Sequence, residues 1–135
     1  MAAAPLLLAH HSNAMFDATK TRVIKGTVQK FGWTNPHGYL EMEVISKSGK
    51  AQSWTVEFQS VQGMARQGLK RESFAPGDTV TVVIHPLRSG KTGGDFLGAI
   101  LADGKPLGDV KELTNTGEGG AAPAAPVAAP AKPAK

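Results

Sequence analysis

Alternation of apolar and polar residues predicts a β-hairpin in the middle of the chain. In segment 39–45 every second residue is apolar, and glutamates lie between them. Segment 52–59 repeats the pattern, and the polar segment 46–50 between the two contains a turn-forming glycine. Because successive side chains of a strand point to opposite faces, each segment predicts a strand with one buried and one wet face. The inward residues are Leu40, Met42, Val44, Trp54, Val56 and Phe58.

Three other segments predict further strands, at 21–31, 79–85 and 96–102, because apolar or β-branched residues dominate them. Gly26 interrupts the first of these segments. An isolated glycine inside a strand marks a bulge or a sharp bend. We therefore expect the first strand to bend at Gly26.

Segment 60–68 predicts a short helix, because its apolar residues recur at spacings of three and four. Ser60 is suited to cap the first turn, and Gly68 is suited to end the helix. Segment 69–74 is expected to add a further turn. The apolar stripe of the helix consists of Val61, Met64 and Ala65.

The order of the expected elements is strand, strand, strand, short helix, strand, strand. A five-stranded Greek-key barrel with a helix between strands three and four has this order, which is that of the OB fold. A bent first strand fits, since that strand pairs with both halves of the barrel. The sequence thus predicts an all-β, OB-like barrel, and a small β-sandwich is the alternative.

The chain divides into four parts on composition. Segment 1–9 is apolar but too short to span a bilayer, so we interpret it as a residual signal peptide, with the start of a cytosolic protein as the alternative. Residues 10–20 form an N-terminal arm and residues 21–113 the barrel domain. Residues 114–135 form an Ala/Pro/Lys-rich tail that is expected to be disordered, because it has almost no side chains that can pack.

The composition excludes several kinds of site. The chain of 135 residues contains no cysteine, which rules out disulfides, thiolate nucleophiles and cysteine zinc sites. Its formal net charge of +4 is dispersed, whereas a nucleic-acid-binding face concentrates basic residues. Residues 89–92 read Ser-Gly-Lys-Thr but lack the leading glycine and following helix of a phosphate-binding loop. We therefore favour a monomeric, non-catalytic protein that does not bind nucleic acid and has no transmembrane segment.

Several short motifs together resemble an uncharacterised family of small exported bacterial proteins. The segments that carry the resemblance are His-His-Ser at 10–12, Met-Phe-Asp at 15–17, Lys-Gly-Thr-Val at 25–28, Trp-Thr-Asn-Pro-His at 33–37, Pro-Gly-Asp at 76–78 and Ala-Asp-Gly-Lys at 102–105. The resemblance covers residues 9–108 and implies an exported, periplasmic protein, but no activity. The chain departs from the family in its shortened signal and in Val61, where members often have proline.

The histidines suggest a metal site. Cleavage after Ala9 would make His10 the first residue, so that its amine and imidazole could chelate one ion. His11 or His37 would add a further imidazole, and nitrogen-rich sites of this kind suit Cu(II) best and Ni(II) next. Alternatively, His37 only forms a hydrogen bond in its loop, and His85 caps its strand or faces solvent.

Aromatic residues suggest a second interpretation. Trp33 and Tyr39 lie beside the strands that bind ligands by stacking in OB folds, whereas Trp54 and Phe58 belong to the core. We therefore expect an exported, non-catalytic binding or accessory module with a copper-type ion on His10, His11 and His37. The alternative is a barrel that binds a small ligand or a protein through Trp33 and Tyr39, with purely structural histidines.

Overall fold

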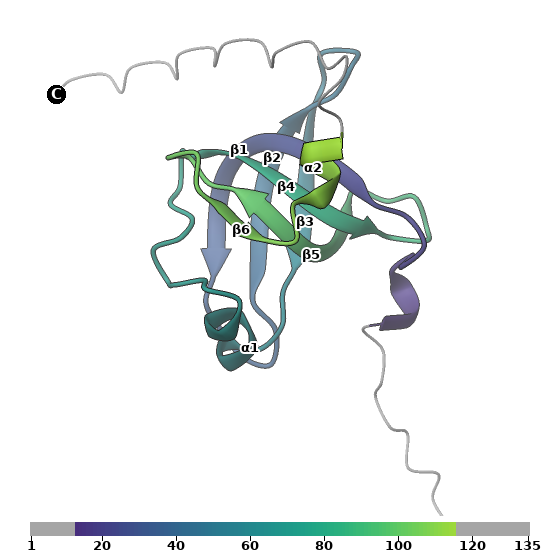
Figure 1. The fold of residues 1–135 in the computed structure, drawn as a ribbon. Coiled ribbons are helices and arrows are strands. Elements are labelled where there is room, and N and C mark those ends of the chain that lie inside the picture. The colour runs from purple at the N-terminus through teal and green to yellow at the C-terminus, as the bar shows by residue number, and fades with distance from the viewer. Residues whose placement is uncertain (1–12, 116–135) are drawn as a thin grey trace, which may run out of the picture.

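The computed structural model describes residues 13–115, in which strands wrap into a closed barrel with a short helix at one end (Figure 1). The strands are β1 (Arg22–Gly32), β2 (Tyr39–Ile45), β3 (Ala51–Glu57), β4 (Thr79–Pro86), β5 (Gly93–Ile100) and β6 (Pro106–Gly108). The helices are η1 (Asn13–Met15), α1 (Val61–Arg66) and α2 (Lys111–Asn115).

The strand pairing is that of an OB barrel. β1 pairs antiparallel with β2 and with β4, β2 pairs with β3, and β4 pairs with β5. A parallel pairing of β3 with β5 closes the barrel, and α1 lies between β3 and β4 in the chain. The predicted all-β, five-stranded, OB-like barrel is therefore confirmed. β6 adds a short sixth strand outside the closed ring, on the edge of β5.

The core follows the alternation seen in the sequence. Leu40 and Met42 of β2 and Val56 of β3 are fully buried, and Trp54 is almost so. An aromatic cluster fills one end of the barrel, where the rings of Phe58 and Phe96 stack at 4.3 Å. Phe31 and Phe74 join it through edge-to-face contacts. Burial of these large apolar side chains is the main force that holds the barrel together.

β1 is irregular at a different position from the one expected. Its pairing with β2 shifts register between Val28 and Lys30, whereas Gly26 pairs regularly with Val80 of β4. A side chain at Gly26 would collide with the backbone carbonyl of Glu43. The glycine therefore permits a close approach of two backbones, and the bulge lies further along the strand.

α1 begins where the sequence indicated, because the Ser60 side chain accepts a hydrogen bond from the backbone N–H of Gly63. It is shorter than predicted, and Gly68, which follows it, has a positive φ of 89°. The predicted apolar stripe is partly wrong, since Met64 is buried but Ala65 is exposed. Residues 69–74 form turns rather than a continuation of the helix.

The C-terminal part contains more structure than expected. β5 begins at Gly93, three residues earlier than predicted, because Gly93 and Gly94 pair with β3 although they carry no side chains to mark a strand. α2 extends to Asn115, and the rest of the predicted tail lies outside the described residues, as do segment 1–9 and the pair His10 and His11. Within residues 13–115, no helix is long and apolar enough to span a membrane.

Candidate functional site

Four titratable side chains lie next to one another at the β3–β5–β4 junction, and we call them the histidine–carboxylate row. They are His37, Glu57, Asp95 and His85. Glu57 of β3 is the register partner of Asp95 of β5, and Asp95 is the partner of His85 of β4. Neighbouring strands lie about 4.8 Å apart, and paired residues share one face of a sheet. Closure of the barrel thus brings together residues that are distant in the chain.

The loop between β1 and β2 carries His37 to the β3 end of the row. Backbone hydrogen bonds join Gly38 to Phe58 and Gln59 and hold this loop in place. Nδ1 of His37 lies 3.0 Å from the carbonyl oxygen of Phe58 and 3.5 Å from Oε1 of Glu57. A carbonyl oxygen only accepts, so Nδ1 carries the hydrogen and the neutral ring keeps its lone pair on Nε2. The hydrogen bond orients the ring, and Nε2 has no hydrogen-bond partner among residues 13–115.

His85 occupies the opposite end of the row. Its Nδ1 lies 3.8 Å from Oδ2 of Asp95, and its side chain is 23% exposed. The side chain faces Asp95 and stays partly exposed, because β5 begins early enough to place Asp95 directly opposite. Within residues 13–115, Nε2 of His85 has no hydrogen-bond partner and is not sealed from solvent.

Asp95 links the two histidines electrostatically. Burial raises the pKa of Asp95, because removal of water disfavours the ionised carboxyl. His85, and more weakly His37, act in the opposite direction, since a positively charged ring favours the carboxylate. Both histidines therefore act on the Asp95 carboxyl.

The predicted metal ligands are only partly within the described structure. His37 is in the row, whereas His10 and His11 lie outside residues 13–115. Among the described residues, no three histidine or carboxylate side chains converge closely enough to hold a metal ion. The row offers two imidazoles, so a metal ion bound there needs ligands from elsewhere.

The arm that precedes β1 runs along the same side of the barrel. Phe16 is buried and forms an isolated β-bridge with Leu87. The backbone N–H of Arg88 donates to the carbonyl of Met15 over 2.9 Å. Met15 and Glu57 line one hollow of about 390 Å³. The arm is therefore anchored beside Glu57, one member of the histidine–carboxylate row.

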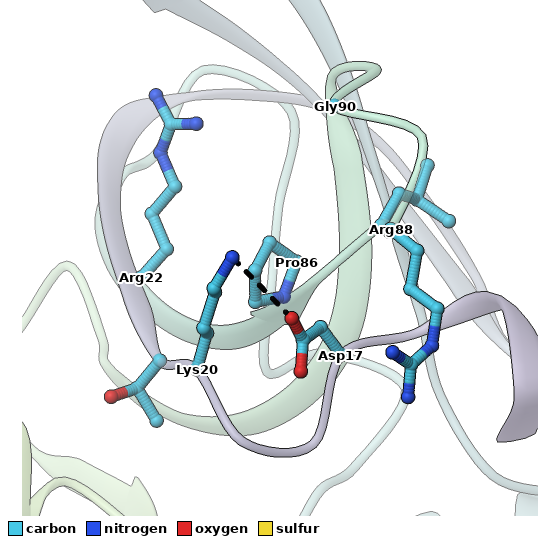
Figure 2. Close-up of a pocket in the computed structure, with 8 residues that line it drawn as sticks. Asp17, Lys20, Arg22, Pro86, Arg88 and Gly90 are labelled. Carbon is cyan, nitrogen blue, oxygen red and sulfur yellow. Dashed lines mark ion pairs between the residues drawn. The ribbon is translucent and has the colours of Figure 1, made fainter.

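A second hollow, of about 440 Å³, lies between the arm and the end of β4 (Figure 2). The Asp17 carboxylate accepts hydrogen bonds from the backbone N–H and the hydroxyl of Thr19, which lower the pKa of Asp17. Lys20 Nζ lies 3.5 Å from this carboxylate. Figure 2 shows Arg22 and Arg88 pointing away from each other. The cations do not converge on a ligand, and the hollow is where the arm is anchored.

The two aromatic residues of the alternative interpretation are both partly buried. Trp33 packs against the core and makes an edge-to-face contact with Phe31, with ring centroids 6.0 Å apart. Tyr39 covers Gly32 of β1, and Lys30 Nζ lies 5.5 Å from its ring centroid. Each ring has a face or edge in use within the barrel, which reduces the surface that it offers to a ligand.

The sequence interpretation did not include Glu57, Asp95 and His85 in a site. Glu57 falls on the wet face of the strand predicted at 52–59, and Asp95 directly precedes the strand predicted at 96–102. The available signal was the combination of a histidine at the end of one strand with an aspartate that begins the next apolar strand. Such residues become partners when the connection between the strands is a hairpin.

The chain matches the profile of a known family. The profile of the "Family of unknown function (DUF6152)" matches residues 1–96, which include the arm, β1–β4 and the beginning of β5. No curated protein and no solved structure matches the chain.

Proposed function

The chain belongs to the DUF6152 family, whose function is unknown, and from this premise we propose that it is an exported, periplasmic accessory module that binds a copper-type metal ion through His10, His11 and His37. The apolar segment 1–9 directly before the histidine pair supports export. The barrel would then be a rigid support that holds the His37 imidazole near the N-terminal histidines His10 and His11.

The observation that carries this proposal is the hydrogen bond from Nδ1 of His37 to the carbonyl of Phe58, over 3.0 Å. Histidines that bind metals almost always donate their other ring N–H to a carbonyl or carboxylate, which fixes the ring and its tautomer. Glu57 adds a carboxylate 3.5 Å from the same nitrogen. The hydrogen bond that typically orients a metal-bound histidine is therefore already present at His37 in the metal-free protein.

The position of the arm supports the participation of the terminal histidines. Met15 is held by Arg88 and lines a hollow together with Glu57. His11 precedes Met15 by four residues. An extended chain spans at most about 3.5 Å per residue, so His11 lies within about 14 Å of Met15. Because Met15 and Glu57 line the same hollow and Glu57 lies beside His37, this short tether supports the proposal that the terminal histidines share an ion with His37.

The ligand types favour copper. A terminal amine and several imidazoles form a nitrogen-rich set, and Cu(II) binds such sets more tightly than the other divalent first-row metals. The chain has no cysteine to favour a softer ion. The proposed role is therefore to bind or hand over Cu(II), with no reaction assigned to the barrel.

Calorimetry tests the proposal on a chain released from a fusion so that it begins at His10. We expect one Cu(II) per chain, weaker Zn(II) binding, and weaker Cu(II) affinity in the His10→Ala and His37→Ala variants. Thr34→Ala changes an exposed side chain in the same loop and serves as the control with unchanged affinity. Absence of Cu(II) binding tighter than the micromolar range would contradict the proposal.

One result would favour the second candidate function. If His37→Ala lowers the melting temperature of the metal-free protein and no metal binds, the histidine is structural. The barrel would then be a module that binds a small ligand or a protein through the edges of Trp33 and Tyr39. Quenching of tryptophan fluorescence by candidate ligands would test that function.

A further inference from the structure

We propose that the surface between the arm and the β4–β5 loop docks on an anionic lipid bilayer. This inference goes beyond the proposed function and does not depend on it, because no proposed metal ligand belongs to the surface. The protein would lie on the membrane peripherally, held by charge and by one shallow apolar contact. We call this region the basic surface, and its members are Met15, Lys20, Arg22, Leu87, Arg88 and Lys91.

Folding gathers cations that are dispersed in the sequence. The arm and the start of β1 contribute Lys20 and Arg22, and the β4–β5 loop contributes two more cations, Arg88 and Lys91. All four side chains belong to exposed residues, and the two hollows that they line adjoin each other at Arg88. Asp17 is the only carboxylate that lines either hollow, and it lies 3.5 Å from Lys20. The basic surface thus carries four positive charges against one negative charge.

An apolar patch lies among these cations. Met15 is 48% exposed, and together with the half-buried Leu87 it lines a hollow of about 390 Å³ whose other members are Arg88, Ser89 and Lys91. The hydrogen bond from the backbone N–H of Arg88 to the carbonyl of Met15 holds the patch in place. Apolar side chains flanked by Lys and Arg suit the membrane interface, because apolar burial adds to the attraction of the cations for anionic headgroups.

The directions of the cations favour a surface of many anionic groups over a single bound anion. Figure 2 shows that the Arg22 and Arg88 side chains diverge, so they do not converge on one phosphate. Cations that are spread apart can each approach a separate headgroup. The negative surface potential of an anionic bilayer attracts every Lys or Arg that comes close to it.

The basic surface is poorly suited to a nucleic-acid strand. Proteins bind single strands by stacking the bases on aromatic side chains. Phe16 is the only aromatic residue in segments 13–22 and 86–93, and it is buried. A strand that extended beyond the surface would also meet the carboxylate of Glu57, which lines the adjoining hollow together with Met15 and Lys91. A bilayer needs neither stacking nor a long basic track.

Co-sedimentation with lipid vesicles tests the proposal, with a chelator present so that metal ions play no part. We expect the chain that begins at His10 to sediment with vesicles of mixed phosphatidylglycerol and phosphatidylcholine, but not with phosphatidylcholine alone. Binding should be lost as the salt rises from about 0.1 M to about 1 M, because the Debye length falls from about 10 Å to about 3 Å. The full chain, measured in parallel, shows what the apolar segment 1–9 adds.

Charge-removing variants locate the binding surface. Arg88→Gln and Lys91→Gln should each weaken partitioning roughly five-fold, which corresponds to about 1 kcal/mol per cation near an anionic bilayer. Met15→Ser should weaken it without a change in charge. Lys47→Gln removes an exposed cation of the β2–β3 turn that lines neither hollow, and it is the matched control with unchanged partitioning. Thermal melting shows whether each variant is folded.

Three results would overturn the proposal. One is the absence of binding to phosphatidylglycerol vesicles at low salt. Another is an equal loss of binding in Lys47→Gln and Lys91→Gln, which would show a response to net charge alone. The third is displacement by free glycerol phosphate, or tighter binding to an oligonucleotide or to polyglutamate than to vesicles. Because no copper is present, the proposal and the copper-binding function succeed or fail separately.

Discussion

Glu57 of β3 and Asp95 of β5 are register partners in the parallel pair that closes the barrel. The seam of the fold thus places two carboxylates side by side, and a histidine flanks each of them. Like charges at paired positions are destabilising. Burial raises the pKa of Asp95, so the cost of ionising this carboxyl arises at the position where the barrel closes.

The first prediction concerns the stability of the metal-free protein at neutral pH. Burial raises the pKa of Asp95 above its ordinary value of 3.8. The folded state therefore holds this proton more tightly than the unfolded state, so a stabilising contribution present below pH 3.8 is lost as the pH rises through the folded pKa. We expect Asp95→Asn to raise the free energy of unfolding at neutral pH by up to about 1 kcal/mol, since the exposed part of the carboxyl is screened.

Urea unfolding in the presence of a chelator measures this effect. The advantage of Asp95→Asn should shrink as the pH falls through the raised pKa of the folded state, and it should be lost below 3.8, where the native carboxyl is neutral in both states. Asp103→Asn, at an exposed turn, is the matched control and should show no such change. A variant that is less stable than the native protein at neutral pH would show that the contact with His85 outweighs the cost of burial.

The second prediction concerns the close approach of β1 and β2. Replacement of a glycine by alanine stabilises a protein by about 0.4–1 kcal/mol where the backbone tolerates it. At Gly26 the added methyl group would collide with the carbonyl of Glu43 and with Val44. We expect Gly26→Ala to lower the free energy of unfolding by about 1–3 kcal/mol, as overpacking does. Thermal and urea unfolding would check this, and Lys25→Ala, at the exposed neighbouring position, should stay within about 0.5 kcal/mol.

The third prediction concerns a buried donor. Trp54 is 3% exposed, and its Nε1 is buried without a hydrogen-bond partner among the described residues. An unsatisfied buried donor costs about 1–3 kcal/mol. We expect Trp54→Phe to cost less than about 1.5 kcal/mol, because removal of the donor offsets the smaller ring and the lost contact with Arg22 at 4.8 Å. Phe58→Ala, which only opens a cavity, should cost about 3–5 kcal/mol in the same urea experiment.

The fold was largely predictable because most of its strands have one buried and one wet face. Alternation placed β2 at its observed ends, and the inward parity of Trp54 and Val56 was correct. The start of β5 was not predictable, since Gly93 and Gly94 carry no side chains and join the strand only through backbone pairing with β3 and β4. The short β6 was not predicted for the same reason, because its three residues form a strand only by pairing with the edge of β5.

The candidate site was less predictable than the fold, because its residues are far apart in the sequence and meet only when the strands pair. His37 was identified from its motif, but its partner Glu57 is 20 residues away and reaches it only through the β2–β3 hairpin. His85 and Asp95 become partners after a register shift between Val83 and Ile84. A one-residue shift in a strand changes which side chains meet. No pattern in the sequence specifies that shift.

The last prediction concerns the anchor of the arm. Phe16 is 6% exposed and pairs with Leu87, and the next residue, Asp17, donates its N–H to the carbonyl of Pro86 over 2.9 Å. Removal of a buried aromatic ring costs about 3–5 kcal/mol, and here the loss falls on a peripheral segment that can detach by itself. We expect Phe16→Ala to speed hydrogen exchange at the Asp17 amide while the amides of β2 stay protected.

Met15→Ala is the matched control for this variant, since the Met15 side chain is 48% exposed in the same segment. If the anchored arm delivers His10 and His11 to the row, Phe16→Ala should also weaken Cu(II) affinity, because the terminal ligands would no longer be held near His37. An unchanged Asp17 exchange rate would show that backbone bonds alone hold the arm. Faster exchange with undiminished copper affinity would instead show that the terminal histidines bind the ion without help from the barrel.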